Sequence, residues 1–189
     1  MKIAFIGSHG VGKTTLSYEL AARLKKQDRI VDLVMEVARS CPLPINRETT
    51  VDAQAWILHT QIAAEIAATS RGGLVVCDRS VLDNYAYLVH AAGRRRAYDA
   101  IVHEWVATYD RLIKVPVLDV PSFDGTRDTS ALFQQEIDRL IDDLAREFAV
   151  PCVALDPTHR DGWVDAVLRA SGLPLHPPQL SIFDRSVAQ

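Results

Sequence analysis

The residues with the clearest chemistry lie near the N-terminus, where the chain reads Gly7-Ser8-His9-Gly10-Val11-Gly12-Lys13-Thr14-Thr15. This run matches G-x-x-x-x-G-K-[ST], a loop whose backbone N–H groups turn toward one anion. Lys13 would supply a point charge for the β- and γ-phosphates, and the Thr14 hydroxyl would ligate Mg²⁺. The pattern therefore predicts ATP and Mg²⁺ as cofactors. The predicted cofactor-binding residues are Ser8, His9, Gly10, Val11, Gly12, Lys13, Thr14 and Thr15.

The segments on both sides of this loop agree with that reading. Residues 2–6 form a short apolar run that predicts a buried parallel strand. Residues 15–26 place leucines at helical spacing, which predicts a helix. A helix that begins at the loop would add its N-terminal dipole to the attraction for phosphate.

Asp78-Arg79-Ser80 follows another apolar run, residues 74–77. A carboxylate that ends a buried strand beside a phosphate loop is placed to hold Mg²⁺ directly or through water. Asp78 or Ser80 could instead cap the next helix, and Ser80 is the better candidate for that role. We predict that Asp78 ligates the metal, and a buried Arg79 beside it would be an unusual choice unless it binds an anion.

Glu36 and Arg39 follow a predicted strand at 30–35. Glu36 would face the same cleft as Lys13, where it could accept a proton or a hydrogen bond from a substrate hydroxyl. Arg39 could grip a phosphate or carboxylate with two hydrogen bonds. The alternative is an exposed ion pair between the two residues at a helix start.

Arg127 lies in a polar segment that precedes a long amphipathic run, residues 131–148. An arginine in a lid near 121–139 would neutralise charge on transferring phosphates. Because Asp124-Gly125 is a strong turn signal, a simple surface turn is equally compatible. Gln54 and Gln61 lie seven residues apart on one face of a predicted helix at 51–70, either to read a base edge or to meet solvent.

Strand-like and helix-like runs alternate along the whole chain. Further strands are predicted at 74–77, within 111–118 and at 151–155, and further helices at 81–92, 97–108, 131–148 and 163–170. This alternation predicts an α/β fold with a mostly parallel sheet and helices on both faces. Ligands of such sheets bind beyond the carboxyl ends of the strands, where the residues above lie.

Composition narrows the class of protein. At 189 residues we expect one domain, 1–172, followed by an irregular tail at 173–189 that contains prolines. The net charge of −3 argues against a nucleic-acid partner. No apolar run reaches the roughly 18 residues of a membrane span, and the start has no signal-peptide pattern. Cys41, Cys77 and Cys152 lack metal-binding spacing. We expect a cytoplasmic protein in which Cys77 and Cys152 are buried free thiols.

The phosphate loop, Glu36-Val37-Ala38-Arg39, Cys77-Asp78-Arg79-Ser80 and Asp124-Gly125-Thr126-Arg127 together resemble a P-loop kinase. The similarity is to the group that contains nicotinamide riboside kinase domains and small "AAA domain" ATP-binding proteins, and more distantly to thymidylate and deoxynucleoside kinases. It spans roughly residues 1–170. The resemblance implies a five-stranded parallel sheet in the order 2-3-1-4-5.

The resemblance also implies roles for individual residues. Lys13, Glu36, Asp78 and Arg127 would be catalytic, Glu36, Arg39 and Arg79 would bind the substrate, and Thr14 and Asp78 would bind the metal. The acceptor would be a nucleoside, a nucleotide or a similar small molecule, and a homodimer is compatible. The chain lacks the Pro-Gly-Gly-Thr segment of thymidylate kinases after Glu36, and Asp78 stands where deoxynucleoside kinases usually have Glu.

Two other functions are alternatives to a kinase. A GTPase switch needs an Asn/Thr-Lys-x-Asp guanine motif, whereas Lys114 is followed by Val-Pro-Val-Leu-Asp, which argues against it. A regulatory ATP-binding protein or ATPase switch without a small-molecule acceptor stays open, because a loop that binds ATP does not name an acceptor.

Overall fold

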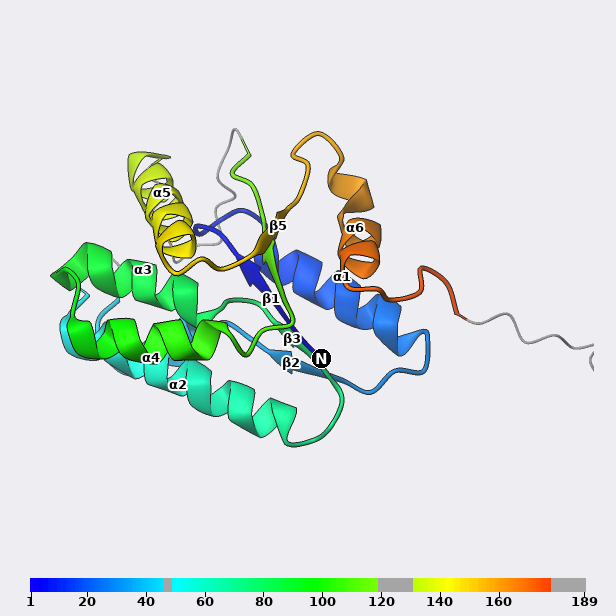
Figure 1. Cartoon of the computed structure of the whole chain (residues 1–189), viewed down its shortest axis with the longest axis horizontal. Helices are drawn as coiled ribbons and strands as arrows, with labels where there is room; N and C mark the ends of the chain where they lie inside the picture. Colours follow the sequence, from blue (N-terminus) through cyan, green and yellow to red (C-terminus); the bar gives the residue numbers. More distant parts are fainter. Residues whose placement is uncertain (46–48, 119–130, 178–189) are drawn as a thin grey trace, which may run out of the picture.

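The computed structural model describes residues 1–45, 49–118 and 131–177. Five parallel strands form one sheet in the order β2-β3-β1-β4-β5 (Figure 1). This confirms the predicted fold class and the predicted strand order. The strands are β1 Lys2–Ile6, β2 Val31–Val34, β3 Leu74–Cys77, β4 Arg111–Lys114 and β5 Cys152–Ala154.

In the described ranges six α-helices connect or follow the strands, each within a few residues of its predicted range. The 3₁₀ helix η1 comes shortly after β2, and the 3₁₀ helix η3 lies between β5 and the last helix. The helices are α1 Lys13–Lys25, α2 Val51–Thr69, α3 Val81–Ala92, α4 Arg96–Val106, α5 Ala131–Glu147 and α6 Trp163–Ala170, with η1 at Val37–Ser40 and η3 at Arg160–Gly162.

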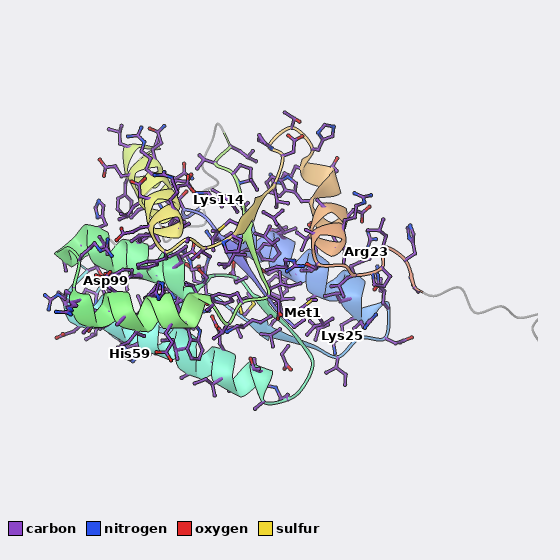
Figure 2. All side chains as sticks on the ribbon, viewed as in Figure 1. Met1, Arg23, Lys25, His59, Asp99 and Lys114 are labelled. Carbon is purple, nitrogen blue, oxygen red and sulfur yellow. The ribbon has the colours of Figure 1, made fainter. Side chains whose placement is uncertain are left out.

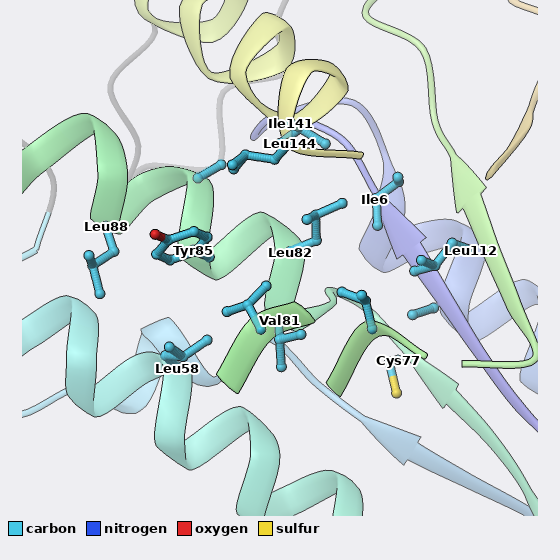
Figure 3. Close-up of a cluster of buried hydrophobic side chains, with 14 of the residues drawn as sticks. Ile6, Leu58, Cys77, Val81, Leu82, Tyr85, Leu88, Leu112, Ile141 and Leu144 are labelled. Carbon is cyan, nitrogen blue, oxygen red and sulfur yellow. The ribbon is translucent and has the colours of Figure 1, made fainter. Parts of the chain in front are cut away.

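Both faces of the sheet are covered by helices (Figure 1). Ile3 and Phe5 of β1 point to the face that α1 and α6 cover, and Ala4 and Ile6 point to the opposite face. This alternation follows from the two-residue repeat of a strand. On the second face α3 lies between α2 and α5, and its Tyr85 is buried at the centre of the cluster (Figure 3).

The predicted lid and tail are described only in part. Arg127 and residues 121–130 of the predicted lid lie outside the described residues, and 131–139 form the first half of α5. Residues 173–177, at the start of the tail, have no regular secondary structure and lie against α1. There Arg23 donates to the carbonyl oxygen of Leu175 at 3.0 Å, and Gln27 donates to that of Pro174 at 2.9 Å.

The prediction for the cysteines was right at one position and wrong at another. Cys77 is buried on β3, and burial raises the pKa of its thiol well above the usual value. Cys152 is exposed, contrary to the prediction. It lies on β5, which forms the edge of the sheet and pairs only with β4, so all three of its residues are exposed. None of the helices in the described ranges has both the length and the apolar character that a membrane crossing requires.

Candidate functional site

The predicted phosphate loop connects the end of β1 to the start of α1, and its glycines at 7, 10 and 12 all have a positive φ. Gly7 has φ +142°, and a Cβ there would lie 2.7 Å from the carbonyl oxygen of Val115. Gly12 precedes α1 in the left-handed region, with φ +93°. Side chains are disfavoured in this region of backbone conformation. The glycines therefore serve the backbone path that the motif requires.

Lys13 lies in the first turn of α1 and is buried. Its Nζ donates to the carbonyl oxygen of Gly7 at 2.6 Å and also to that of Ser8. Burial and the nearby Arg79 guanidinium lower the pKa of Lys13 to about 7, while the carboxylates of Asp83, Asp78 and Glu36 act in the opposite direction. The ammonium thus lies in a place where additional negative charge would stabilise it.

Thr14 and Asp78, the predicted metal ligands, are brought together. The Thr14 hydroxyl donates to Oδ2 of Asp78 at 2.7 Å, and Asp78 is buried at the carboxyl end of β3. A hydroxyl and a carboxylate oxygen suit Mg²⁺, which prefers oxygen ligands and completes its shell with water and phosphates. In the described ranges there is no group of three or more His, Cys, Asp or Glu side chains that could hold a metal.

Glu36 and Arg79, from the ends of β2 and β3, form a buried ion pair. Nε of Arg79 donates to Oε1 of Glu36 at 2.7 Å, and Nη2 lies 2.7 Å from the same oxygen. Nε of Arg39 donates to the other oxygen, Oε2, at 3.2 Å. Burial by itself would lower the pKa of Arg79, but Glu36 and the neighbouring groups Tyr87 and Asp83 hold it above the usual value. The guanidinium therefore stays charged.

The alternative of a simple exposed Glu36–Arg39 pair is only half right. Arg39 is half exposed and does pair with Glu36, but the Glu36 side chain is only 7% exposed and its shorter contacts are to Arg79. The guanidinium of Arg79 also lies 5.2 Å from the ring centroid of Tyr87. The predicted substrate-binding residues thus form one connected group beside Lys13.

Asp83 is part of this site, although the sequence analysis did not single it out. It is buried in the first turn of α3, and its Oδ1 accepts a hydrogen bond from the backbone N–H of Gly7 at 2.8 Å. Its Oδ2 accepts from the N–H and the hydroxyl of Ser80, which completes a capping box. The spacing of Ser80 and Asp83 was a usable signal for the cap. No local sequence pattern indicates the contact between Asp83 and Gly7.

Helix α5 holds the phosphate loop from another side, which the sequence also did not reveal. Gln134 is buried, and its Nε2 donates to the carbonyl oxygen of His9 at 2.8 Å. Oδ1 of Asp138 accepts from the N–H of Ser8 at 3.3 Å and pairs with Lys114 at 3.1 Å. Lys114 lies at the end of β4, close to α5 (Figure 2). Helix α5, whose first half falls within the predicted lid, is thereby hydrogen-bonded to the predicted phosphate loop.

A groove of about 420 Å³ lies between α1 and α6 and begins at the phosphate loop. Gly12 and Thr15 line one end, and Arg23, which Figure 2 shows on α1 beside α6, lines the other. The guanidinium of Arg160 lies 5.8 Å from the ring centroid of Trp163. The lining residues are Gly12, Thr15, Leu16, Glu19, Ala22, Arg23, Lys26, Arg160, Asp161, Trp163 and Val164.

Gln54 and Gln61 of α2 are both buried, so the alternative of solvent-facing side chains was wrong. Nε2 of Gln54 donates to the hydroxyl of Thr49 at 2.8 Å. Nε2 of Gln61 donates to the carbonyl oxygen of Arg79 at 3.0 Å, so this buried glutamine holds the main chain of a predicted site residue.

Comparison with known proteins gives one family and a set of similar folds. The sequence model of a family described as "AAA domain" matches residues 2–161. No curated protein matches the chain. Similar solved structures include a deoxyadenosine kinase from M. mycoides with dCMP and dCDP bound. That structure is 15% identical, with a TM-score of 0.63, over 91% of this chain and 99% of that one.

Two further structures show the same fold. One is a thymidylate kinase from Ehrlichia chaffeensis, 20% identical with a TM-score of 0.65, over 89% of this chain and 98% of that one. The other is NadR in complex with NR, 19% identical with a TM-score of 0.72. That match covers 92% of this chain and 52% of NadR, so this chain spans about half of that protein.

Proposed function

We propose that this protein, which belongs to the AAA domain family matched over residues 2–161, is an ATP- and Mg²⁺-dependent phosphotransferase that acts on a nucleoside, a nucleotide or a similar small molecule. One observation carries the proposal: the buried Glu36–Arg79 pair lies beside the phosphate loop and the Thr14–Asp78 contact. A protein that only binds or hydrolyses ATP does not need this second polar group. The similar structures named as deoxyadenosine kinase and thymidylate kinase support this class of acceptor.

On the donor side, the loop residues 8–15 would bind the phosphates of ATP through backbone N–H groups. Lys13 would turn its ammonium from the carbonyl oxygens of Gly7 and Ser8 to the β- and γ-phosphates. Thr14 and Asp78 would hold Mg²⁺, which neutralises charge on the phosphate oxygens during transfer. Asp83 and Gln134 would keep the loop in place through Gly7 and His9.

On the acceptor side, Glu36 would accept a hydrogen bond from the reacting hydroxyl and orient it. Both of its guanidinium partners favour the ionised carboxylate, which is the form that accepts such a bond. Arg79 would direct its positive charge toward the region between donor and acceptor, and Arg39 would contact the acceptor from the rim. Arg127 stays a predicted lid arginine, because it lies outside the described residues.

We place the base of the nucleotide in the groove between α1 and α6. Three observations support this: the groove begins at Gly12 and Thr15, it is large enough for a nucleoside, and it offers both the Trp163 ring and the Arg160 guanidinium. An Arg160→Ala change should weaken ATP binding without changing the choice of acceptor. Equilibrium binding of ATP and competition between acceptors would separate the two effects.

The deciding experiment incubates the protein with Mg-ATP and separate pools of nucleosides, nucleoside monophosphates and nicotinamide riboside. ADP release and new phosphorylated products are followed together. A pool that raises ADP formation above the basal rate and yields its own phosphorylated product supports the phosphotransferase. If no pool does so, the regulatory ATP-binding protein or ATPase switch becomes the better function.

A paired substitution tests Glu36 itself. Glu36→Gln should lower turnover far more than ATP affinity, because the residue would orient the acceptor and not the donor. Asp32→Asn is the matched control: Asp32 lies on β2, shortly before Glu36 in the chain, and also pairs with an arginine, Arg71 at 2.8 Å, but at the start of the strand. Loss of ATP affinity without loss of turnover in Glu36→Gln would place Glu36 in nucleotide binding instead.

A further inference from the structure

A buried polar cluster centred on Glu65 lies behind the site. Glu65, on α2, is fully buried. One of its oxygens accepts from Lys2 and from the Trp105 indole, each at 2.8 Å, and the other accepts from Tyr109 at 2.7 Å and Gln61 at 2.8 Å. A buried ion pair adds little net stability, since desolvation offsets its attraction. The cluster therefore calls for another explanation.

Members of the cluster form hydrogen bonds with the main chain on both sides of Ser80. Gln61 donates to the carbonyl oxygen of Arg79 at 3.0 Å, and the Tyr109 hydroxyl accepts from the N–H of Val81 at 2.9 Å. From the other side Asp83 accepts from the N–H of Ser80 at 3.0 Å. The side chains of Gln61, Asp83 and Tyr109 thus hold the two peptide groups that flank Ser80, directly after Arg79.

Burial of the Gln61 side chain carries a cost in free energy, because one of its polar atoms is left without a hydrogen bond. Its Oε1 is buried and has no hydrogen-bond partner among residues 1–45, 49–118 and 131–177. An apolar side chain of similar size would avoid that cost. What the amide provides is its pair of N–H donors, one on Glu65 and one on the Arg79 carbonyl.

We propose that Gln61 is a positioning residue that links the Glu65 cluster to the Arg79–Glu36 pair. By holding the Arg79 carbonyl, Gln61 sets the direction in which the Arg79 side chain leaves the backbone, and so its contact with Glu36. The importance of this for catalysis rests on the proposed function, whereas the positioning itself does not. Misplacement of a reacting group by about 1 Å can cost on the order of a hundredfold in rate.

The first test reads the position of Arg79 directly by NMR. The Nε–H of Arg79 is buried and bonded to Glu36, so its ¹H–¹⁵N signal should exchange slowly with water. The signal is assigned by its loss in Arg79→Lys. In Gln61→Met we expect it to shift and to exchange at least about tenfold faster, because the carbonyl that orients Arg79 loses its donor. Gln61→Asn, which keeps the amide but is one methylene shorter, serves if the Met variant does not fold.

Gln27→Met is the matched control. Gln27 is also buried, donates Nε2 to a main-chain carbonyl at 2.9 Å and leaves its Oε1 unpaired within the described ranges, but it does so at the end of α1 against Pro174. Like Gln61→Met, this variant removes one hydrogen bond to a main-chain carbonyl and one unpaired amide oxygen. It should leave the Arg79 signal and the kinetics unchanged.

The second test measures kcat and KM with the acceptor that wild type uses. We expect Gln61→Met to lower kcat roughly tenfold to a hundredfold with little change in the KM for ATP. An unchanged Arg79 signal in both Gln61 variants overturns the inference and leaves the proposed function standing. If wild type phosphorylates no acceptor, the proposed function fails, and the NMR result still decides whether Gln61 positions Arg79.

Discussion

Lys13 is a basic side chain in a buried position, and in the proposed function this would couple its protonation to nucleotide binding. Burial and the Arg79 guanidinium bring the pKa of Lys13 to about 7, so that much of it is neutral just above that pH. Phosphate groups in the loop would favour the charged ammonium and raise the pKa again. Above pH 7, binding of a nucleotide should therefore take up a proton.

We predict an uptake of roughly 0.9 proton on binding of Mg-ADP at pH 8, and close to none at pH 6, where Lys13 is already protonated. The sign follows from a pKa that is lower in the free protein than in the complex. Affinity should accordingly fall as pH rises above 7, by up to about tenfold per pH unit. Calorimetry in buffers of different ionisation enthalpy measures the uptake directly. A binding enthalpy at pH 8 that is independent of the buffer would contradict the prediction.

Helix α3 connects the phosphate loop to the turn that carries Asp78 and Arg79. Its cap is made by Ser80, whose hydroxyl accepts from the N–H groups of Leu82 and Asp83, while Asp83 reaches back to Gly7. The same element thus begins its own helix and fixes the start of the loop. Damage to this cap should affect stability and ligand binding together.

Two cap variants separate these effects at the scale of the helix. Ser80→Ala removes the N-cap hydroxyl of α3, and Thr50→Ala removes that of α2. Each change should lower the free energy of unfolding by about 1 kcal/mol. Ser80→Ala should also weaken ATP binding by about fivefold, the factor that corresponds to 1 kcal/mol. Urea unfolding and equilibrium binding measure the two quantities. Equal ATP affinities in the two variants would show that the cap does not reach the loop.

At the scale of the whole molecule, the site is built at one end of a sheet whose two faces are packed by different helices. Elements from both faces meet the loop: α1 starts from it, while α3 and α5 hold Gly7, Ser8 and His9. A ligand in the loop would therefore contact residues from both layers. Its binding energy should stabilise the entire domain against unfolding.

A thermal shift measures that linkage. At an ATP concentration about a hundredfold above Kd, binding should add about 2.7 kcal/mol and raise Tm by roughly 5–10 °C for a chain of this size. Lys13→Ala should abolish the shift. Lys25→Ala, the same change at an exposed position of α1, should preserve it. An equal shift in both variants would refute the role of Lys13 in binding.

Much of this architecture follows from local patterns in the sequence. The alternation of strand and helix runs predicts the parallel sheet, because each run's periodicity reports its own buried faces. The phosphate loop is predicted because its glycines, Lys13 and Thr14 are consecutive, so their geometry depends on few neighbours. Because Glu36, Asp78 and Arg79 follow strands, they are expected together at the carboxyl end of the sheet. In the structure all three lie there, close to Lys13.

The polar side chains that support these residues could not be identified from local patterns. Asp83 reaches Gly7 across 76 residues, and Gln134 reaches His9 across 125, and no local spacing encodes such contacts. Gln61 looked the same in sequence as an exposed glutamine, and its burial depends on how α2 packs beside the cluster around Glu65. Cys152 is exposed because β5 became the edge of the sheet, which depends on strand order and not on composition. The predicted phosphate loop can be recognised in the sequence because adjacent residues define it, whereas the side chains that hold the loop in place come from distant segments and depend on how those segments pack.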